Sequence, residues 1–233
     1  FEAPGTVFAK PTPDAARISN LERSVFTPNL SVAWDASYMS HFPRVAEIWK
    51  ISYEEKMGTR VDGVFSVTPA IIQELLKVVG PIDVDGRILD GTNATSYLQN
   101  GIYKEFLYRG ISLETGNSQC DYMFTQIAYK TIDKVFGSMG LSEILGYLEV
   151  YENGVANRTI MMWFPNEEEQ QTVKNAGATG ALNDDPYHPQ AGVYMGGSYA
   201  CKLGWYVDIV PEILGNTANP DGSVTYDIRV SFY

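Results

Sequence analysis

The chain contains 233 residues, of which 45% are hydrophobic and 12% aromatic. This composition excludes disorder over most of the length and suits one compact body. Seventeen basic and twenty-eight acidic side chains give a formal net charge of −11. Such a charge repels phosphate backbones and anionic lipid, so it argues against nucleic acid as a partner.

No stretch approaches the ~18 consecutive apolar residues of a membrane helix. The chain begins at Phe1 without a signal-type segment, and its last predicted strand runs to the final residue. We therefore expect a piece of a longer protein, with any membrane anchor outside it.

Residues 1–40 are predicted to be an irregular arm, because prolines interrupt every apolar run. A helix is predicted over residues 42–57, with Pro43 in its first turn and Gly58 just past its end. A buried strand over residues 61–67 should follow.

Thr68 and Pro69 then start a helix that Gly80-Pro81 ends. Asp85-Gly86 predicts a type I′ hairpin turn between residues 82–84 and 87–89, since both positions tolerate positive φ angles.

Helical periodicity continues over three further stretches, residues 94–107, 120–136 and 141–151. Residues 158–164 are predicted to form a second buried strand, and Asn166 should cap a helix with an acidic first turn. Large apolar side chains alternate with other residues over residues 226–232, which predicts a closing strand. Strands that alternate with helices predict an α/β fold, a mixed sheet covered by several helices, with residues 41–233 as a single domain.

The sequence contains no glycine-rich nucleotide motif and no Gly-x-Ser-x-Gly elbow. Residues 34–44 instead gather aromatic and polar groups before a helix N-terminus, where an anion binds well and Arg44 could add a forked contact. Trp34 and Asp35 belong to this segment. The structural alternative is that Asp35 or Ser40 caps a turn and Arg44 is a solvated residue of the first helical turn.

Residues 192–206 mix glycines with tyrosines and a tryptophan, a composition that suits stacking on sugar rings but also ordinary cores. Cys120 and Cys201 lie in similar polar surroundings and lack the spacing of a zinc site. They predict either one disulfide in an oxidising compartment or two half-buried thiols.

Four motifs follow one another along most of the chain. An Asp-containing aromatic segment leads to Phe-Pro (residues 35–43), and Gly-Thr-Arg-Val-Asp-Gly-Val (58–64) and Val-Gly-Pro-Ile-Asp-Val (79–84) come next. A later Val-Tyr…Lys-Leu-x-x-Tyr spans residues 193–206. With this order the chain, above all residues 29–102, resembles an uncharacterised bacterial family, domain of unknown function 4012.

That family is in turn similar to the LytR-CpsA-Psr cell-wall ligases, whose corresponding turns match residues 60–62 and 80–82 here. Those ligases bind a polyprenyl pyrophosphate and transfer a glycopolymer onto peptidoglycan, using arginines and a magnesium-binding aspartate. The resemblance implies a three-layer α/β architecture and, for a ligase-like protein, Mg²⁺ as cofactor.

The resemblance also implies an extracytoplasmic domain of a bacterial envelope protein, membrane-anchored or cell-wall-associated, with a cell-wall or polyprenyl-linked glycan as partner. In one interpretation it is a glycopolymer phosphotransferase, in which Asp35 and Arg44 are catalytic and hold a pyrophosphate or its metal. Lys202, Tyr206 and Trp34 would then contribute to binding. The alternative is a non-catalytic envelope domain that binds glycan or protein.

Overall fold

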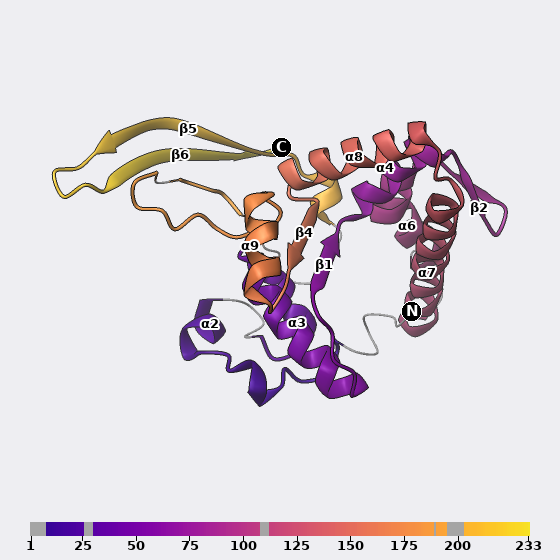
Figure 1. Ribbon diagram of the computed structural model, residues 1–233, viewed down its shortest axis with the longest axis horizontal. Helices are drawn as coiled ribbons and strands as arrows, with labels where there is room; N and C mark the ends of the chain where they lie inside the picture. Colours follow the sequence, from indigo (N-terminus) through magenta and orange to yellow (C-terminus); the bar gives the residue numbers. More distant parts are fainter. Residues whose placement is uncertain (1–7, 26–29, 108–111, 189, 195–202) are drawn as a thin grey trace. The chain divides into compact units, whose positions relative to one another are not determined.

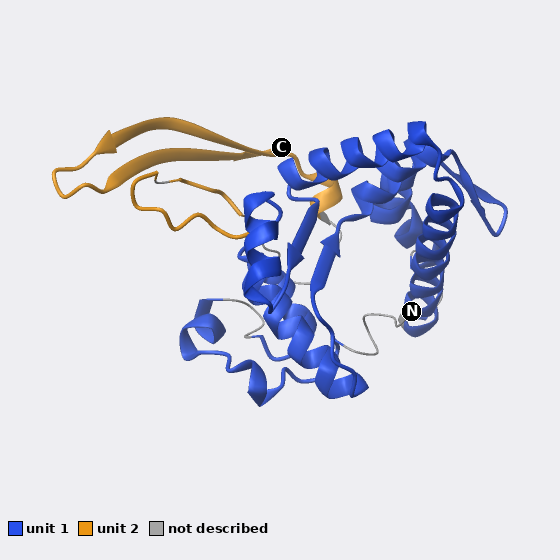
Figure 2. Ribbon diagram, in the orientation of Figure 1, with its two compact units in different colours: residues 1–180 blue, residues 181–233 orange. Residues whose placement is uncertain are grey.

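The computed structural model describes residues 8–25, 30–107, 112–188, 190–194 and 203–233. The chain divides into two compact units, residues 1–180 and residues 181–233 (Figure 2), and each is described by itself. The single domain expected over residues 41–233 stays a prediction.

The described part of the N-terminal arm contains short helices, η1 (Asp14–Ala16), α2 (Asn20–Val25) and η2 (Ala33–Tyr38) (Figure 1). These helices precede α3 (Phe42–Met57), which has the predicted bounds. Gly58 ends α3 in the left-handed conformation, with φ of 67°, which glycine adopts without steric cost.

Strand β1 (Val64–Val67) pairs antiparallel with β4 (Ile160–Trp163), and Val64 lies opposite Trp163. Side chains of the two strands alternate between faces. Val64 and Trp163 pack against the buried residues of α3 and the arm, while Phe65, on the other face, is 62% exposed. Both strands are shorter than the sequence predicts, but both lie within the predicted ranges.

Helix α4 (Pro69–Val79) also has its predicted bounds. The hairpin of β2 (Ile82–Val84) and β3 (Arg87–Leu89) follows, with φ of 51° at Asp85 and 79° at Gly86. Positive φ at both central residues is the signature of the type I′ turn, so this prediction is confirmed.

The helix predicted over residues 94–107 consists of α5 (Ala94–Ser96), a π turn, η3 (Tyr97–Gly101), and α6 (Ile102–Phe106). The next helix, α7 (Leu113–Gly137), starts earlier than predicted because the Ser112 hydroxyl caps it, accepting from Thr115 N–H at 3.2 Å.

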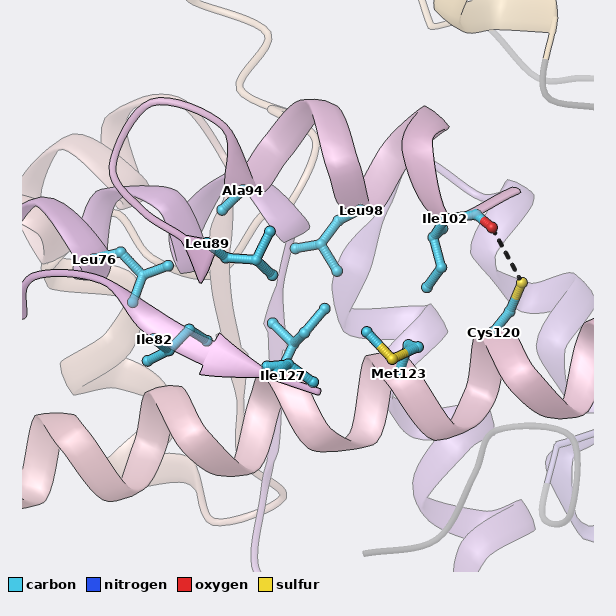
Figure 3. Packing of buried hydrophobic residues seen from close by; sticks show 10 residues of the cluster. Leu76, Ile82, Leu89, Ala94, Leu98, Ile102, Cys120, Met123 and Ile127 are labelled. Atoms are coloured by element: carbon cyan, nitrogen blue, oxygen red, sulfur yellow. Dashed lines mark hydrogen bonds between the residues drawn. The ribbon is translucent and has the colours of Figure 1, made fainter. Parts of the chain in front are cut away.

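Elements from α4 to α7 enclose the larger apolar core of the first unit. Figure 3 shows its side chains: Leu76, Ile82, Leu89, Ala94, Leu98, Ile102, Cys120, Met123 and Ile127. This core and the smaller one around α3 account for most of the buried apolar side chains that the structure describes.

Helix α8 (Leu141–Ala156) packs along α4. Two glycines permit this approach, Gly146 facing the methyl groups of Val78 and Gly154 facing Ile71 and Ile160. Helix α9 (Glu167–Asn175) has the predicted cap, because Asn166 Oδ1 accepts from the N–H groups of Glu168 and Glu169 at 3.0 and 3.1 Å.

The second unit contains η4 (Leu203–Tyr206) and a hairpin of β5 (Ile209–Ala218) and β6 (Val224–Phe232). Strand β6 includes the predicted closing strand. Its partner β5 lies partly in a segment for which the sequence predicted no strand.

The chain is therefore a mixed α/β protein, as predicted. Among the described residues, however, the strands form three separate two-stranded antiparallel sheets in place of one covered sheet. Two of the three are hairpins whose short turns pair each strand with its neighbour in sequence. The three-layer architecture implied by the ligase resemblance is not confirmed. Within the described helices, none has the length and apolar character needed to cross a bilayer.

Candidate functional site

Asp35 lies in η2 and is only 2% exposed. Its Oδ2 accepts from the backbone N–H of Val32 at 3.2 Å and from the Ser31 hydroxyl at 3.4 Å. The carboxylate thus caps the first turn of η2, which is the structural role that the sequence left open.

Arg44 lies in the first turn of α3 and holds the arm against this helix. Its Nε donates to Glu22 Oε1 at 2.7 Å, and one terminal nitrogen donates to Glu47 Oε2 at 2.5 Å. The other terminal nitrogen donates to the carbonyl oxygens of Ala16 and Arg17 at 2.9 and 3.3 Å. Arg44 is therefore paired, and not solvated as the structural alternative expected.

These contacts make a closed electrostatic group, which we call the Arg44 clamp (Ala16, Arg17, Glu22, Arg44 and Glu47). The hydrogen bond from Arg44 lowers the pKa of Glu22 from 4.5 to about 2, and the same bond raises the pKa of Arg44. Two carboxylates face the one guanidinium of Arg44, so its charge is already neutralised. A pyrophosphate would have to displace Glu22 and Glu47 to reach Arg44.

The predicted binding residues are distributed over both units. Trp34 lies in η2 of the first unit with 48% of its surface exposed, and Tyr206 lies in η4 of the second with 56% exposed. Lys202 lies outside the described residues. Their common role in a ligand site stays a prediction.

Cys120 is buried in the larger core, and its Sγ lies 3.9 Å from the carbonyl oxygen of Ile102 (Figure 3). Cys201 lies outside the described residues, so the disulfide stays a prediction. Labelling of the denatured, unreduced protein with a thiol reagent tests it: a bridge leaves both cysteines unlabelled, and quantitative labelling of both would contradict it.

A magnesium site would need several oxygen ligands close together. Among the residues that the structure describes, no group of three His, Cys, Asp or Glu side chains could hold a metal ion. Asp35 uses its carboxylate to cap η2. The described residues therefore do not fit a carboxylate-bound Mg²⁺ at this position.

A polar cluster on the β2–β3 hairpin is also self-contained. Arg87 pairs with Glu105 and lies 4.8 Å from the ring centre of Tyr97, whose hydroxyl donates to Glu105 at 3.0 Å. Burial and then this hydrogen bond raise the pKa of Tyr97. Because the three side chains satisfy one another, we assign them to the stability of the hairpin.

A groove between α4 and α8 has a volume of about 520 Å³. That volume is within the range of small-molecule sites, roughly 300–1,000 Å³. We call it the α4–α8 groove. It is lined by Ala70, Ile71, Glu74, Lys77, Val78, Gly146, Glu149, Val150, Asn153, Gly154, Asn157 and Thr159.

The lining of the groove is partly apolar and partly polar. Small and aliphatic residues of both helices supply the apolar part, and α8 approaches α4 closely at Gly146 and Gly154. The polar part consists of two carboxylates, two amides, a hydroxyl and an ammonium group on the groove walls. Lys77 donates to Glu74 at 2.6 Å, so the formal charge of the walls is −1.

Sequence reasoning missed this groove. Its polar residues come from two helices separated by more than sixty positions in the sequence, and periodicity gives no information on which helices pack together. The available signal was Gly146, a glycine inside the helix predicted over residues 141–151, because glycine within a helix often marks a close packing contact.

One family model matches the chain. Residues 3–103 match the family described as protein of unknown function (DUF4012). No curated protein and no solved structure matches the chain. The matched region contains α3, α4 and the β2–β3 hairpin and three of the four motifs that carry the sequence resemblance, while the motif over residues 193–206 lies outside it. The match confirms the resemblance to the DUF4012 family over residues 3–103, which are less than half of the chain.

Proposed function

We propose that this chain is an extracytoplasmic domain of a bacterial cell-envelope protein that binds a cell-wall glycan without transferring it, and that the α4–α8 groove is the binding site. The envelope setting rests on the resemblance of the motif order to the LytR-CpsA-Psr ligases. Any membrane anchor would lie outside this chain.

The composition of the groove carries the proposal. Sugars present hydroxyl and amide groups around apolar C–H faces, and they are bound by side chains that accept and donate several hydrogen bonds. Glu149, Asn153 and Asn157 line one wall, on α8 and just past its C-terminus, and Glu74 and Lys77 line the other. The small and aliphatic residues of the lining offer the apolar contact.

The charge of the groove favours an uncharged glycan over a pyrophosphate. Its walls have a formal charge of −1, and the chain as a whole has a net charge of −11. Arg44, the cation expected to hold a pyrophosphate, is instead bound by two carboxylates and two carbonyl groups. These contacts favour the binding alternative over the phosphotransferase.

Calorimetric titration with soluble oligosaccharides of N-acetylglucosamine tests the proposal. We expect saturable binding that weakens about 3- to 10-fold in Asn153→Ala, which removes an amide group, and in Glu149→Gln, which replaces a charged acceptor oxygen by an NH2 donor. Glu152→Gln is the matched control, because Glu152 lies on α8 outside the groove.

The control should bind as tightly as the wild type. Absence of binding by the wild type, or equal affinity in all four proteins, would overturn the assignment of the groove.

A further inference from the structure

The surface of α8 that faces away from α4 carries large apolar side chains in an uninterrupted row. Together with the end of α7, it presents six such side chains that are each between 43% and 76% exposed. We call this set the α8 stripe: Phe136, Met139, Leu141, Ile144, Leu145 and Leu148.

The stripe is separate from the core-forming face of the same helix. Residues 141, 144, 145 and 148 follow the i, i+3, i+4, i+7 pattern of one helical face. Gly146, Val150 and Gly154 lie on the opposite face, which packs against α4 and lines the groove. Helix α8 is therefore apolar on two sides, and the described part of the first unit covers one of them.

The stripe is held in a fixed position. The Tyr147 hydroxyl lies 3.1 Å from the carbonyl oxygen of Val135 and 2.8 Å from that of Ser138, at the end of α7. These contacts fix the turn between α7 and α8, so the six side chains are preorganised for a partner, which lowers the entropic cost of association.

The exposed area of the stripe approaches what a stable dimer needs. At their observed exposures, the six side chains present on the order of 400 Å² of apolar surface. Each partner in a standard interface contributes roughly 800 Å², of which somewhat more than half is apolar. The stripe thus supplies about the apolar part of one such interface, and its polar surroundings would supply the rim.

We propose that the α8 stripe binds the α8 stripe of a second copy of this chain, with the two helices antiparallel about a two-fold axis near Leu145. An apolar row is self-complementary under such an axis. Leu148, three positions past the axis, would then lie near residue 142 of the other α8.

The charges at the end of the stripe favour the antiparallel arrangement. Glu152 follows the stripe towards the C-terminal end of α8, which contains no lysine or arginine. In an antiparallel pair it lies beside the N-terminal end of the other helix, whose N–H groups attract carboxylates. A parallel pair would place Glu152 next to its own copy.

Sedimentation velocity of the whole chain over a concentration series tests the inference. We expect the wild type to dimerise and Leu145→Glu to weaken the dimer at least about 30-fold, because it buries like charges at the axis. Ile88→Glu is the matched control, since Ile88 is 53% exposed on β3 outside the stripe. It should dimerise like the wild type.

Oxidative cross-linking is a second measurement, and it can detect a dimer that is too weak for sedimentation velocity. Leu145→Cys should form a covalent dimer much faster than Ile88→Cys, because only the first brings two thiols together at a two-fold axis. A wild type that stays monomeric at every concentration, or equal cross-linking of the two cysteine variants, would overturn the proposal. So would association of the wild type only with a different protein.

Discussion

Arg44 shows how one side chain with several donors can order a segment that has little regular structure. Its guanidinium contacts carbonyl groups of the arm and two carboxylates, one from α2 and one from α3. A guanidinium presents five N–H donors in a fixed fork, which suits such divided contacts better than the single ammonium of lysine. The arm is thus fixed to α3 by charge as well as by its apolar residues.

Replacing Arg44 should destabilise the first unit. We expect Arg44→Ala to lower the free energy of unfolding by about 2–3 kcal/mol, because it removes the guanidinium that donates to Glu22, to Glu47 and to two carbonyl groups. Arg44→Lys should have an intermediate effect, since it keeps the charge but loses the fork. Urea denaturation measures both, and a change below about 0.5 kcal/mol for Arg44→Ala would contradict the clamp.

The same clamp predicts a pH dependence. The pKa of Glu22 is about 2 in the folded protein and 4.5 as its ordinary value. A lowered folded-state pKa contributes stability above the unfolded-state pKa, and this contribution is lost as the pH falls towards the folded-state pKa. The stability difference between wild type and Glu22→Gln should therefore be constant above pH 5 or so and shrink between about pH 4.5 and 2.

Thermal unfolding of the two proteins at pH 7, 4 and 2.5 measures this difference. A difference that stays the same at all three values would show that Glu22 is not stabilised as a carboxylate by Arg44.

At the scale of elements, the contact of α4 with α8 determines both the packing of the first unit and the shape of the groove. A Cβ atom at Gly146 would lie 2.8 and 2.9 Å from the two methyl groups of Val78. Val78 is β-branched and has few alternative rotamers. The helices could accommodate the added methyl only by separating.

Gly146→Ala should therefore destabilise the protein by about 1–2 kcal/mol, although alanine favours the helix itself. Gly137→Ala is the matched control at the end of α7, because no atom lies within 4 Å of the position of its Cβ. It should be neutral or slightly stabilising. Equal effects of the two substitutions in urea denaturation would rule out a steric role for Gly146.

Elements with local stop and start signals were predictable from the sequence. Helix α3, helix α4 and the β2–β3 hairpin have their predicted bounds, since prolines, glycines and Asp85-Gly86 determine the backbone there. The π turn η3 and strand β5 were not predicted. A π turn depends on packing against other elements, and β5 is defined by pairing with β6, so neither has a strong local signal.

The candidate site was less predictable for the same reason. The sequence placed Asp35 and Arg44 near the start of a helix, and the structure agrees. It gave no indication that Glu22, twenty-two positions before Arg44, would bind the guanidinium. Long-range pairs of this kind depend on the tertiary fold, as does the α4–α8 groove.

At the scale of the whole molecule, the two proposals use opposite faces of α8. The groove lies on the side of Gly146 and Gly154, and the α8 stripe on the side of Leu145. A dimer through the stripe would leave both grooves open and present two binding sites to one glycan strand. Linked sites raise the apparent affinity for a repeating polymer beyond that of either site alone.

Leu145→Glu should accordingly bind a short oligosaccharide like the wild type but bind polymeric peptidoglycan less tightly. Co-sedimentation with purified peptidoglycan measures the second quantity, with Ile88→Glu as control. Equal retention of all three proteins would show that the dimer does not contribute to polymer binding.

The most direct test of the central claim, that the α4–α8 groove binds a glycan, is an amide NMR titration of the isotopically labelled chain with N-acetylglucosamine oligosaccharides. We predict saturable shift changes centred on the groove, at Gly146, Asn153 and Gly154 and in the facing part of α4. Shift changes confined to residues outside α4 and α8, or none at saturating sugar, would contradict the account.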